Sequence, residues 1–305
     1  MHDSTKPYRG RFAPSPTGPL HFGSLIAAVG SYLDARRNAG RWLVRMEDLD
    51  RARESKGAAD AILRTLEAYG FQWDDEVVRQ SNRGAAYGAA LDRLRSEGAV
   101  FPCACTRREI SDSNLGGTDE PIYPGTCRNG LPPGRPTRSI RARVDDAPIA
   151  FEDRLQGRTE QNLAREVGDF VVRRADGLFA YQLAVVVDDF EQGISDVVRG
   201  ADLLASTPRQ ILLQRRLGYP TPRYAHLPVA VNAKGEKLSK QTLAAPLAPN
   251  DASSQLCKAL RFLGQDPPRG LDSASISDLW GWAIGAWTIE KVPKRRSALA
   301  DVCAF

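Results

Sequence analysis

Apolar and polar positions along the first fifty residues change period twice, from that of a strand to that of a helix and back. The stretch YRGRFAPS, residues 8–15, has strand character and breaks at Pro14. GSLIAAVGSYLDARRNAG, residues 23–40, places apolar side chains at helical spacing and ends on a glycine. RWLVRMEDLD, residues 41–50, alternates again and ends in an acidic loop. This order predicts a βαβ unit and therefore a parallel sheet.

The same patterns predict further elements downstream. We expect helices over residues 57–71, 83–100 and 201–219, the last starting at Thr207 and Pro208, and mainly helix over 241–305. We expect short strands over 139–144 and 149–157, and strands again over 169–194 around an Ala-Asp-Gly turn.

Residues 101–140 differ in kind, because they are rich in Pro, Gly, Asp and Arg and have little apolar periodicity. Such a segment is typical of an insertion that is stabilised by something other than a hydrophobic core. We therefore divide the chain into two catalytic halves, an insertion and a C-terminal helical region, at residues 1–100, 101–165, 166–245 and 246–305.

Composition limits the class of protein but does not indicate a function. The 305 residues are 42% hydrophobic and 26% charged, as in globular proteins that bury a sizeable core. No stretch has the roughly 20 apolar residues of a membrane span, and the polar N-terminus does not resemble a secretory signal, so we expect a cytoplasmic protein. A net charge of +5 permits a nucleic-acid partner, but it is equally typical of an ordinary solvated surface.

The segment PSPTGPLHFGS, residues 14–24, places prolines, glycines and one histidine at the predicted start of a helix. A helix N-terminus has unpaired N–H groups and partial positive charge, both of which attract phosphate. Gly18 and Gly23 permit unusual backbone angles or close approach of a ligand, and His21 could donate a hydrogen bond to a phosphate. Taken alone, a loop with a locally satisfied histidine explains the segment equally well.

A second motif, GEKLSKQ at residues 235–241, brackets a serine with Lys237 and Lys240. These ammonium groups could neutralise the charge that builds on a triphosphate during attack at its α-phosphate. A basic surface loop is the commoner explanation of such a motif by itself. The order of both motifs on a parallel-sheet framework is more specific than either motif alone.

Together the two motifs resemble the signatures of class I aminoacyl-tRNA synthetases. HFGS, residues 21–24, is similar to the His-x-Gly-His signature, and KLSKQ, residues 237–241, to the Lys-Met-Ser-Lys-Ser signature, with Ser24 and Gln241 departing at the last positions. GRFAPSPTGPLHFGSLIAA and RWLVRMEDLDRAR resemble the glutamyl branch, and the resemblance covers residues 8–245. It implies an α/β fold: a Rossmann-like, parallel-sheet class I synthetase catalytic domain with a zinc-stapled insertion and a short helical C-terminal region.

The resemblance also implies roles for individual residues. The implied catalytic residues are His21, Gly23, Lys237 and Lys240, and the implied ATP contacts are His21, Gly23, Ser24 and Lys240. The implied glutamate contacts are Arg11, Phe12, Ala13, Pro14, Ser15, Glu47, Tyr181 and Arg199. Because glutamate presents two carboxylates and one ammonium, we assign Arg11 and Arg199 to the carboxylates, and Glu47 and Tyr181 to the amino group. Taken singly, each of these residues is explained equally well as a member of a surface ion pair.

Three of the five cysteines, Cys103, Cys105 and Cys127, fall inside the insertion. Without a secretory signal this cluster favours reduced thiols and structural zinc over disulfides, with free thiols as the alternative. Tetrahedral zinc needs a fourth ligand. A Cys-x-Cys and Tyr-x-x-x-Cys arrangement with Tyr123 resembles a subgroup of the family, while Asp119, Glu120 or water stay open as alternatives.

Only residues 241–305 follow Lys240, which we expect to leave no room for the anticodon-binding domain of glutamyl-tRNA synthetases. The resemblance is thus to short members of the glutamyl branch, which use ATP with Mg²⁺ to convert L-glutamate to glutamyl-adenylate. They transfer the glutamyl group to the queuosine base at the wobble position of tRNA(Asp), with the anticodon arm expected in the catalytic cleft. Two alternatives are a minimal glutamyl-tRNA synthetase that charges the tRNA 3′ end and a non-catalytic RNA-binding paralogue. We expect a monomer.

Overall fold

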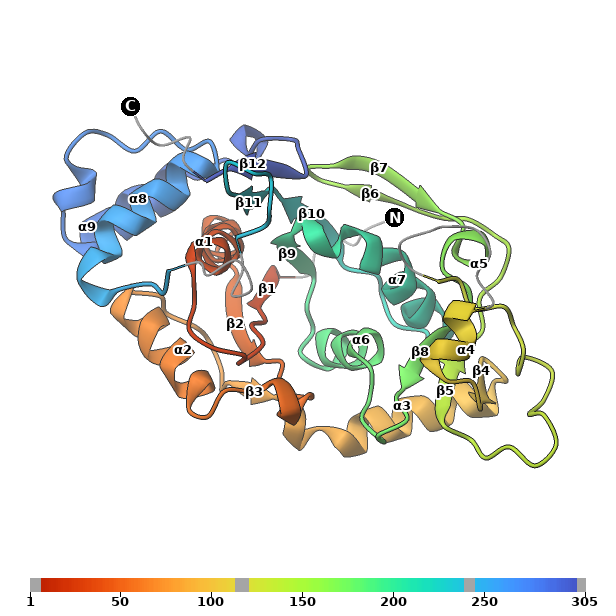
Figure 1. Ribbon diagram of the computed structural model, residues 1–305. Helices are drawn as coiled ribbons and strands as arrows, with labels where there is room; N and C mark the ends of the chain where they lie inside the picture. Colours follow the sequence, from red (N-terminus) through yellow and green to blue (C-terminus); the bar gives the residue numbers. More distant parts are fainter. Residues whose placement is uncertain (1–6, 113–120, 239–244, 301–305) are drawn as a thin grey trace.

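A parallel sheet in two halves forms the centre of the computed structural model, which describes residues 7–112, 121–238 and 245–300 (Figure 1). In one half the strands run parallel in the order β1 (Arg9–Phe12), β2 (Arg41–Met46) and β3 (Val78–Arg79). In the other half, β9 (Asp196–Gly200), β10 (Arg223–Leu227) and β6 (Ile149–Asp153) run parallel, and β7 (Gly157–Gln161) is antiparallel at the edge. The Ser195 N–H donates to the Arg9 carbonyl at 3.0 Å, so the halves meet at β1 and the start of β9.

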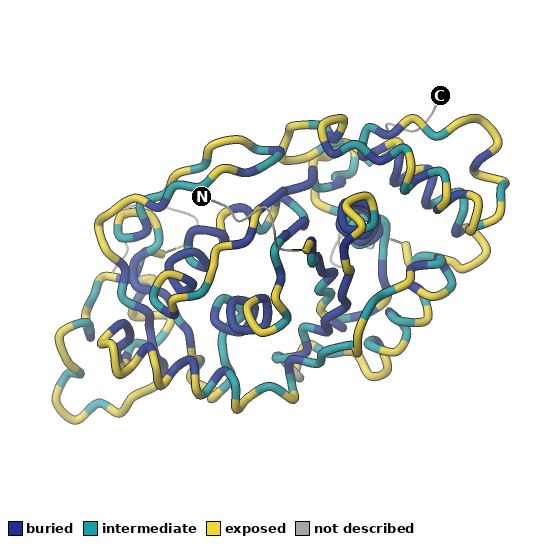
Figure 2. Tube along the Cα trace, turned by 180° about the vertical axis from the view of Figure 1, so that it is seen from behind, coloured by how far each residue is buried: buried dark blue, intermediate teal, exposed yellow. Residues whose placement is uncertain are grey.

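Two long helices, α1 (Phe22–Arg37) and α6 (Tyr181–Glu191), are buried along most of their length, as Figure 2 shows. α1 connects β1 to the parallel β2, which confirms the predicted βαβ unit. The predicted helices near residues 57–71, 83–100 and 201–219 are also confirmed. The other α-helices in the described part of the chain are α2 (Ala58–Ala68), α3 (Gly84–Ser96), α4 (Arg107–Asp112), α5 (Leu163–Glu166), α7 (Thr207–Arg216), α8 (Ala252–Phe262) and α9 (Ile276–Ala286).

The segment 169–194 contradicts the predicted pair of strands. Only β8 (Phe170–Arg173), before the turn, is a strand, and α6 follows the turn. Apart from its two aspartates, the run LAVVVDDF in α6 is apolar, and every residue from Leu183 to Asp189 is buried. A continuous apolar run fits a buried helix as well as a strand, so its period could not distinguish the two.

The second strand, β2, is buried on both faces. Although its sequence alternates apolar and charged residues, the last five of its six residues are buried, Arg45 included. Parallel strands are commonly covered on both faces, because the connecting helices pack there. Arg45 is therefore a buried cation rather than a surface charge.

The insertion folds on a small antiparallel sheet of its own, β4 (Val100–Cys103), β5 (Ser139–Ala142) and β8. It has a modest apolar cluster, made of Phe101, Cys103, Ala104, Ile110, Tyr123 and Cys127. β6, which lies inside the segment 101–165, instead joins the main sheet, where Asp153 pairs with Tyr224 of β10.

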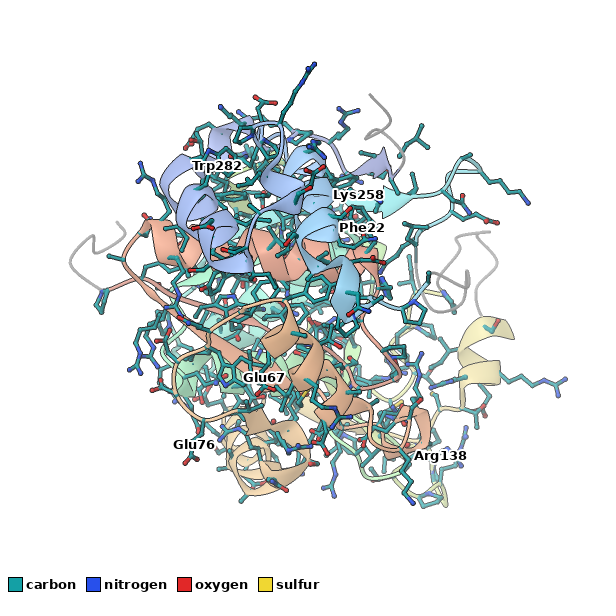
Figure 3. The ribbon with its side chains drawn as sticks, turned by 90° about the vertical axis from the view of Figure 1, so that its left-hand side faces the viewer. Phe22, Glu67, Glu76, Arg138, Lys258 and Trp282 are labelled. Carbon is teal, nitrogen blue, oxygen red and sulfur yellow. The ribbon has the colours of Figure 1, made fainter. Side chains whose placement is uncertain are left out.

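The described part of the C-terminal region packs on α1 through α8, and α8 and α9 are its two α-helices. Phe22 of α1 meets Phe262 of α8 edge to face, with ring centroids 6.1 Å apart. Figure 3 shows this side of the molecule, with Trp282 of α9 and Arg138 of the insertion at opposite ends of the view. A short strand, β12 (Ser297–Leu299), pairs in parallel with β11 (Val229–Val231). Among the described residues, no helix has the length and apolar character needed to cross a membrane.

Candidate active site

Four of the predicted glutamate contacts share one electrostatic environment at the carboxyl ends of the central strands. Arg11 lies near the end of β1, Glu47 directly follows β2, and Arg199 lies near the end of β9. Tyr181 begins α6, and burial raises the pKa of its hydroxyl, with Glu47 raising it further while Arg199 and Arg11 lower it. Open parallel sheets bind ligands at this edge, because loops diverge there. The structure thus brings these four side chains together.

Arg11 is held by a buried ion-pair network. Its Nε lies 3.2 Å from Oδ1 of Asp189, and its Nη2 lies 3.5 Å from Oδ2. Arg45, which has no exposed surface, donates from Nη2 to the same Oδ1 at 2.8 Å and lies 3.6 Å from Asp188. Buried charges are tolerated when paired in this way. Asp189 therefore fixes the orientation of the Arg11 guanidinium.

Glu47 is the acidic group of the pocket. Its backbone N–H donates to the Pro14 carbonyl at 3.0 Å, and its Oε1 lies 3.7 Å from Nη2 of Arg45. That oxygen is buried and has no hydrogen-bond partner among the described residues. Burial raises the pKa of Glu47 to about 7, although Arg45 and Arg11 oppose the rise. A carboxyl group poised in this way can ionise when an ammonium group arrives.

Arg199 is buried and makes contacts from three nitrogens. Its Nε donates to Nε2 of His226 at 3.1 Å, its Nη2 donates to Oγ1 of Thr207 at 2.8 Å, and its Nη1 lies 3.5 Å from the Tyr181 hydroxyl. His226 in turn lies 2.5 Å from Asp153, measured from Nδ1 to Oδ2. The guanidinium is thus fixed, with its Nη1 side next to Tyr181.

The predicted glutamate contacts in the first loop differ in how accessible they are to a ligand. Phe12 is buried and stacks on Trp42 with ring centroids 6.2 Å apart, so its side chain belongs to the core and leaves its backbone for a ligand. Ala13, Pro14 and Ser15 are at least partly accessible, and the Pro14 carbonyl bonds Glu47. The loop is thus tied to Glu47 through its backbone.

The first signature caps α1. His21 is the residue before the helix, and its Nδ1 accepts a hydrogen bond from the Ser24 N–H at 3.3 Å. Nδ1 as acceptor places the proton of a neutral imidazole on Nε2, which suits donation to a phosphate. Gly18 has a positive φ of 147°, as a glycine-rich turn requires. The structure therefore places His21 and Ser24 at the helix N-terminus, as predicted.

The second signature lies against the first. A Cβ added to Gly23 would come within 3.1 Å of the Leu238 carbonyl oxygen, and His21 pairs with Pro246 in an isolated bridge. Lys237 forms an ion pair with Asp202, with 2.5 Å between Nζ and Oδ2. Lys240 and Gln241 lie outside the described residues. The residues that flank them on both sides nevertheless meet the start of α1.

The three insertion cysteines converge. Their Sγ atoms lie within 4.8 Å of one another, and those of Cys105 and Cys127 are 3.7 Å apart. The Tyr123 hydroxyl lies 3.5 Å from Sγ of Cys103 and accepts from the Cys127 N–H at 2.8 Å. In a tetrahedral zinc site, metal–ligand bonds of about 2.3 Å to sulfur and 2.0 Å to oxygen put sulfur atoms about 3.8 Å apart and sulfur about 3.5 Å from oxygen.

These spacings show that the cluster could hold a metal ion, with Tyr123 next to it. Burial opposes ionisation of Cys103, but hydrogen bonds with Tyr123 and Arg141 lower its pKa to about 7, which favours the thiolate a metal needs. Burial raises the pKa of Cys105 to about 11. Asp119 and Glu120, the alternative ligands, lie outside the described residues.

No motif in the sequence identifies the groups that support these side chains. Asp189 lies in a segment that we expected to be a strand, so the orientation of its side chain toward Arg11 could not be inferred. Arg45, His226 and Asp153 belonged to no motif. The only available indication for His226 was its position among apolar residues in YAHLPVAV, where a histidine is usually a satisfied core residue.

Comparisons with known proteins agree with this geometry. The family model described as "tRNA synthetases class I (E and Q), catalytic domain" matches residues 8–255. The chain is 63% identical over 294 residues to a glutamyl-Q tRNA(Asp) synthetase of Dechloromonas aromatica, covering 95% of this chain and 97% of that one. It is 60% identical over 300 residues to a protein of the same name from Aromatoleum aromaticum, covering 98% and 95%.

A solved structure shares the architecture. A glutamate tRNA ligase from Elizabethkingia meningosepticum, crystallised in complex with its amino acid, superposes with a TM-score of 0.79 at 25% identity. The match covers 95% of this chain and 66% of that one. The parallel-sheet α/β fold that we expected is thereby confirmed.

Proposed function

The chain belongs to the glutamyl-Q tRNA(Asp) synthetases, within the class I tRNA synthetases for glutamate and glutamine, and on this premise we propose how its site works. The protein is an ATP-dependent ligase that activates L-glutamate and transfers it to the queuosine base of tRNA(Asp). One observation carries the proposed mechanism. Two fixed guanidinium groups and one largely buried carboxyl group lie together at the carboxyl ends of the strands next to the α1 N-terminus.

Glutamate fits this pocket by charge. We assign its two carboxylates to Arg11 and Arg199, because guanidinium groups bind carboxylates with directed hydrogen bonds. The Asp189 carboxylate holds Arg11 from one side, through Nε and Nη2. Glu47 and the Tyr181 hydroxyl receive the ammonium group. Ammonium in turn favours the ionised form of Glu47, whose pKa is raised to about 7 by burial.

Activation joins a carboxylate oxygen of glutamate to the α-phosphorus of ATP and breaks the bond between that phosphorus and the bridging oxygen of pyrophosphate. We propose that the N-terminus of α1 and Nε2–H of His21 bind the phosphates. Gly23 leaves space for the Leu238 backbone, which brings the second signature to the same place. Lys240 and Lys237 then stabilise the charge that grows on the leaving pyrophosphate.

Lys240→Ala tests the assigned role of the second signature. We expect glutamate-dependent exchange of pyrophosphate with ATP to fall by about a hundredfold, since one preorganised charge is typically worth that much. The unfolding transition should stay at its wild-type position. An exchange rate equal to that of the wild type would remove this lysine from the mechanism.

Transfer then joins the activated carbonyl carbon to a hydroxyl of the queuosine cyclopentene-diol, and AMP leaves. We propose that the anticodon arm of tRNA(Asp) enters the cleft where glutamyl-adenylate forms, so the wobble base reaches the adenylate directly. The net charge of +5 supports binding of the phosphate backbone, and we expect it to weaken as salt is added. We further propose that the protein acts in the cytoplasm as a monomer.

Metal ions take two roles in this proposal. Zinc fits the donor set of Cys103, Cys105 and Cys127 with Tyr123, and it would stabilise the insertion rather than enter the reaction. Mg²⁺ accompanies ATP and would neutralise part of its phosphate charge. We retain the division of the chain into 1–100, 101–165, 166–245 and 246–305 as a proposal, with β6 contributing to the main sheet.

The experiment that tests the proposal is transfer of labelled glutamate to tRNA from cells that can or cannot make queuosine. We expect label only on tRNA(Asp) that contains queuosine, and we expect it to survive removal of the tRNA 3′ end. Label on tRNA(Glu) that disappears with the 3′ end would establish the alternative, a minimal charging enzyme. Absence of pyrophosphate exchange would favour a non-catalytic paralogue.

A further inference from the structure

A buried hydrogen-bond chain runs from Asp153 at the end of β6, through His226 of β10, to Arg199 of β9. We propose that Asp153 and His226 are positioning residues, which fix the Arg199 guanidinium so that a single edge faces the substrate carboxylate. The inference rests on the proposed function in one respect, namely that Arg199 binds glutamate. Neither residue touches the substrate in that mechanism.

Hydrogen-bond chemistry determines the state of His226. An arginine Nε always carries its proton, so the His226 Nε2 at 3.1 Å must accept from Arg199. The imidazole is therefore neutral with its proton on Nδ1, which lies 2.5 Å from Oδ2 of Asp153. Burial, opposed by Asp153 but reinforced by Arg199, lowers the pKa of His226, in agreement with the neutral form. Its exposed fraction is 0%.

Asp153 is itself immobilised by the backbone. Its Oδ1 accepts the N–H groups of Leu155 at 3.0 Å, Gln156 at 2.9 Å and His226 at 3.1 Å. The other oxygen, Oδ2, is left to select the His226 tautomer. The turn between β6 and β7 thus holds the carboxylate, the carboxylate holds the imidazole, and the imidazole holds Arg199.

The hydrogen bonds of Arg199 within the protein determine which of its nitrogens can bind the substrate carboxylate. Nε is used by His226, and Nη2 by Thr207 at 2.8 Å. Nη1, 3.5 Å from the Tyr181 hydroxyl, is the remaining edge. A carboxylate would therefore be bound by Nη1 together with Tyr181, and its direction would be set before glutamate arrives. Preorganisation of this kind lowers the entropic cost of binding.

Asp153→Asn tests the chain without touching Arg199. An amide oxygen can keep the three backbone hydrogen bonds, but the amide NH₂ then faces Nδ1 and forces the His226 proton onto Nε2. Two donors would face each other at Arg199. In pyrophosphate exchange we expect KM for glutamate to rise at least about tenfold, the effect of losing a hydrogen bond to a charged group, while KM for ATP stays within about twofold.

Two substitutions of His226 separate positioning from mere packing. His226→Leu removes the acceptor, and we expect it to raise KM for glutamate as Asp153→Asn does. In His226→Gln the amide oxygen can accept from Arg199, so we expect KM within about threefold of the wild type. A purely structural role predicts no such rescue. Asp34→Asn is the matched control: a buried aspartate bonded to Tyr8 and Arg154, whose loss should lower stability without changing KM for glutamate.

A spectroscopic measurement on the wild type adds a readout that does not depend on activity. The chain has three histidines, so the imidazole ¹⁵N spectrum is simple, and the resonance missing from His226→Gln identifies His226. We expect the Nδ1–H tautomer, which is the minor one in water. The Nε2–H tautomer or an imidazolium at pH 7 would overturn the proposal.

Arg199→Lys distinguishes failure of this inference from failure of the proposed function. If Arg199→Lys leaves KM for glutamate unchanged, the assignment of Arg199 to the substrate is wrong. If Arg199→Lys raises that KM and Asp153→Asn does not, the proposed function stands and the positioning role is refuted.

Discussion

Glu47 combines two properties that single residues rarely combine, since it is charged when it binds an ammonium group, yet its side chain is only 10% exposed. Its Oε1 has no hydrogen-bond partner among the described side chains, and burial raises its pKa to about 7. Arg45 and Arg11 keep the pKa from rising further. Binding of an ammonium group should therefore depend on pH in the neutral range.

We predict that kcat/KM for glutamate in pyrophosphate exchange falls about tenfold per pH unit below pH 7 and levels off above it. The reason is that protonation removes the negative charge that pairs with the ammonium group. A series of initial rates between pH 5.5 and pH 8.5 measures this directly.

Glu47→Gln is the control for that profile. Its kcat/KM at pH 8 should be at least about tenfold below the wild type, and it should change little between pH 6 and pH 8. A profile with the same midpoint in both proteins would show that another group titrates.

At the scale of elements, the N-terminus of α1 is in close contact with segments that are distant in the sequence. The Leu247 N–H donates to the Leu20 carbonyl at 3.0 Å, and Leu238 reaches Gly23 from the other side of the undescribed segment. The absent side chain of Gly23 is what allows this approach. Sequence analysis singled out Gly23 for ligand access, whereas the structure shows a backbone neighbour as well.

Gly23→Ala should therefore displace the second signature or His21 by a few tenths of an ångström, because the new Cβ would meet Leu238 at 3.1 Å and the His21 ring at 3.2 Å. We predict that pyrophosphate exchange falls by about tenfold, since small misplacements of reacting groups are costly. Gly84→Ala is the matched control, because an added Cβ there has no neighbour within 4 Å. Equal rates in the two variants would contradict the prediction.

The insertion has few apolar residues to stabilise it. Its small cluster surrounds the cysteines, so a metal ion would replace the hydrophobic burial that the segment lacks. The sequence alone indicated this weakness, through its low apolar periodicity.

Cys103→Ser should lower bound zinc from about one ion per chain to near zero and should make the insertion more sensitive to protease. Elemental analysis of the purified proteins measures the first effect, and limited proteolysis the second. Cys257 is buried in the main core, away from the insertion, so the control variant Cys257→Ser should bind as much zinc as the wild type. Wild-type protein without zinc would remove this proposal.

At the scale of the whole molecule, Asp34 of α1 joins three parts of the chain. It accepts from Tyr8 near the N-terminus at 2.6 Å, from Arg154 after β6 at 2.6 Å and from Trp287 of the C-terminal region at 3.3 Å. Asp34 is 1% exposed. The C-terminal region is therefore tied to the catalytic sheet by a polar contact as well as by packing.

We predict that Asp34→Asn lowers the free energy of unfolding by about 2 kcal/mol, because Tyr8 and Arg154 lose hydrogen bonds to a buried charged acceptor, while Arg154 keeps Asp196 at 3.8 Å. Urea denaturation followed by tryptophan fluorescence measures the change. A loss below about 0.5 kcal/mol would show that water replaces Asp34 at little cost.

The sequence by itself determined the βαβ start, the histidine and glycines at the N-terminus of α1 and the low apolar content of the insertion. Those conclusions follow from local chemistry: period, caps, turns and residue types. The substrate-contacting residues were instead implied by the family resemblance and stay a proposal. The expectation of strands over 169–194 was wrong, because a buried helix and a buried strand both present unbroken apolar runs.

Only the tertiary structure decided which charges support the pocket. Arg45, Asp189, His226 and Asp153 come from four different elements, and no local pattern links them. Their partners are chosen by strand order and register, for example by the pairing of His226 with Arg199 across β10 and β9. A buried polar side chain is stable only when its partner lies within hydrogen-bond distance, and that distance is a property of the packed fold.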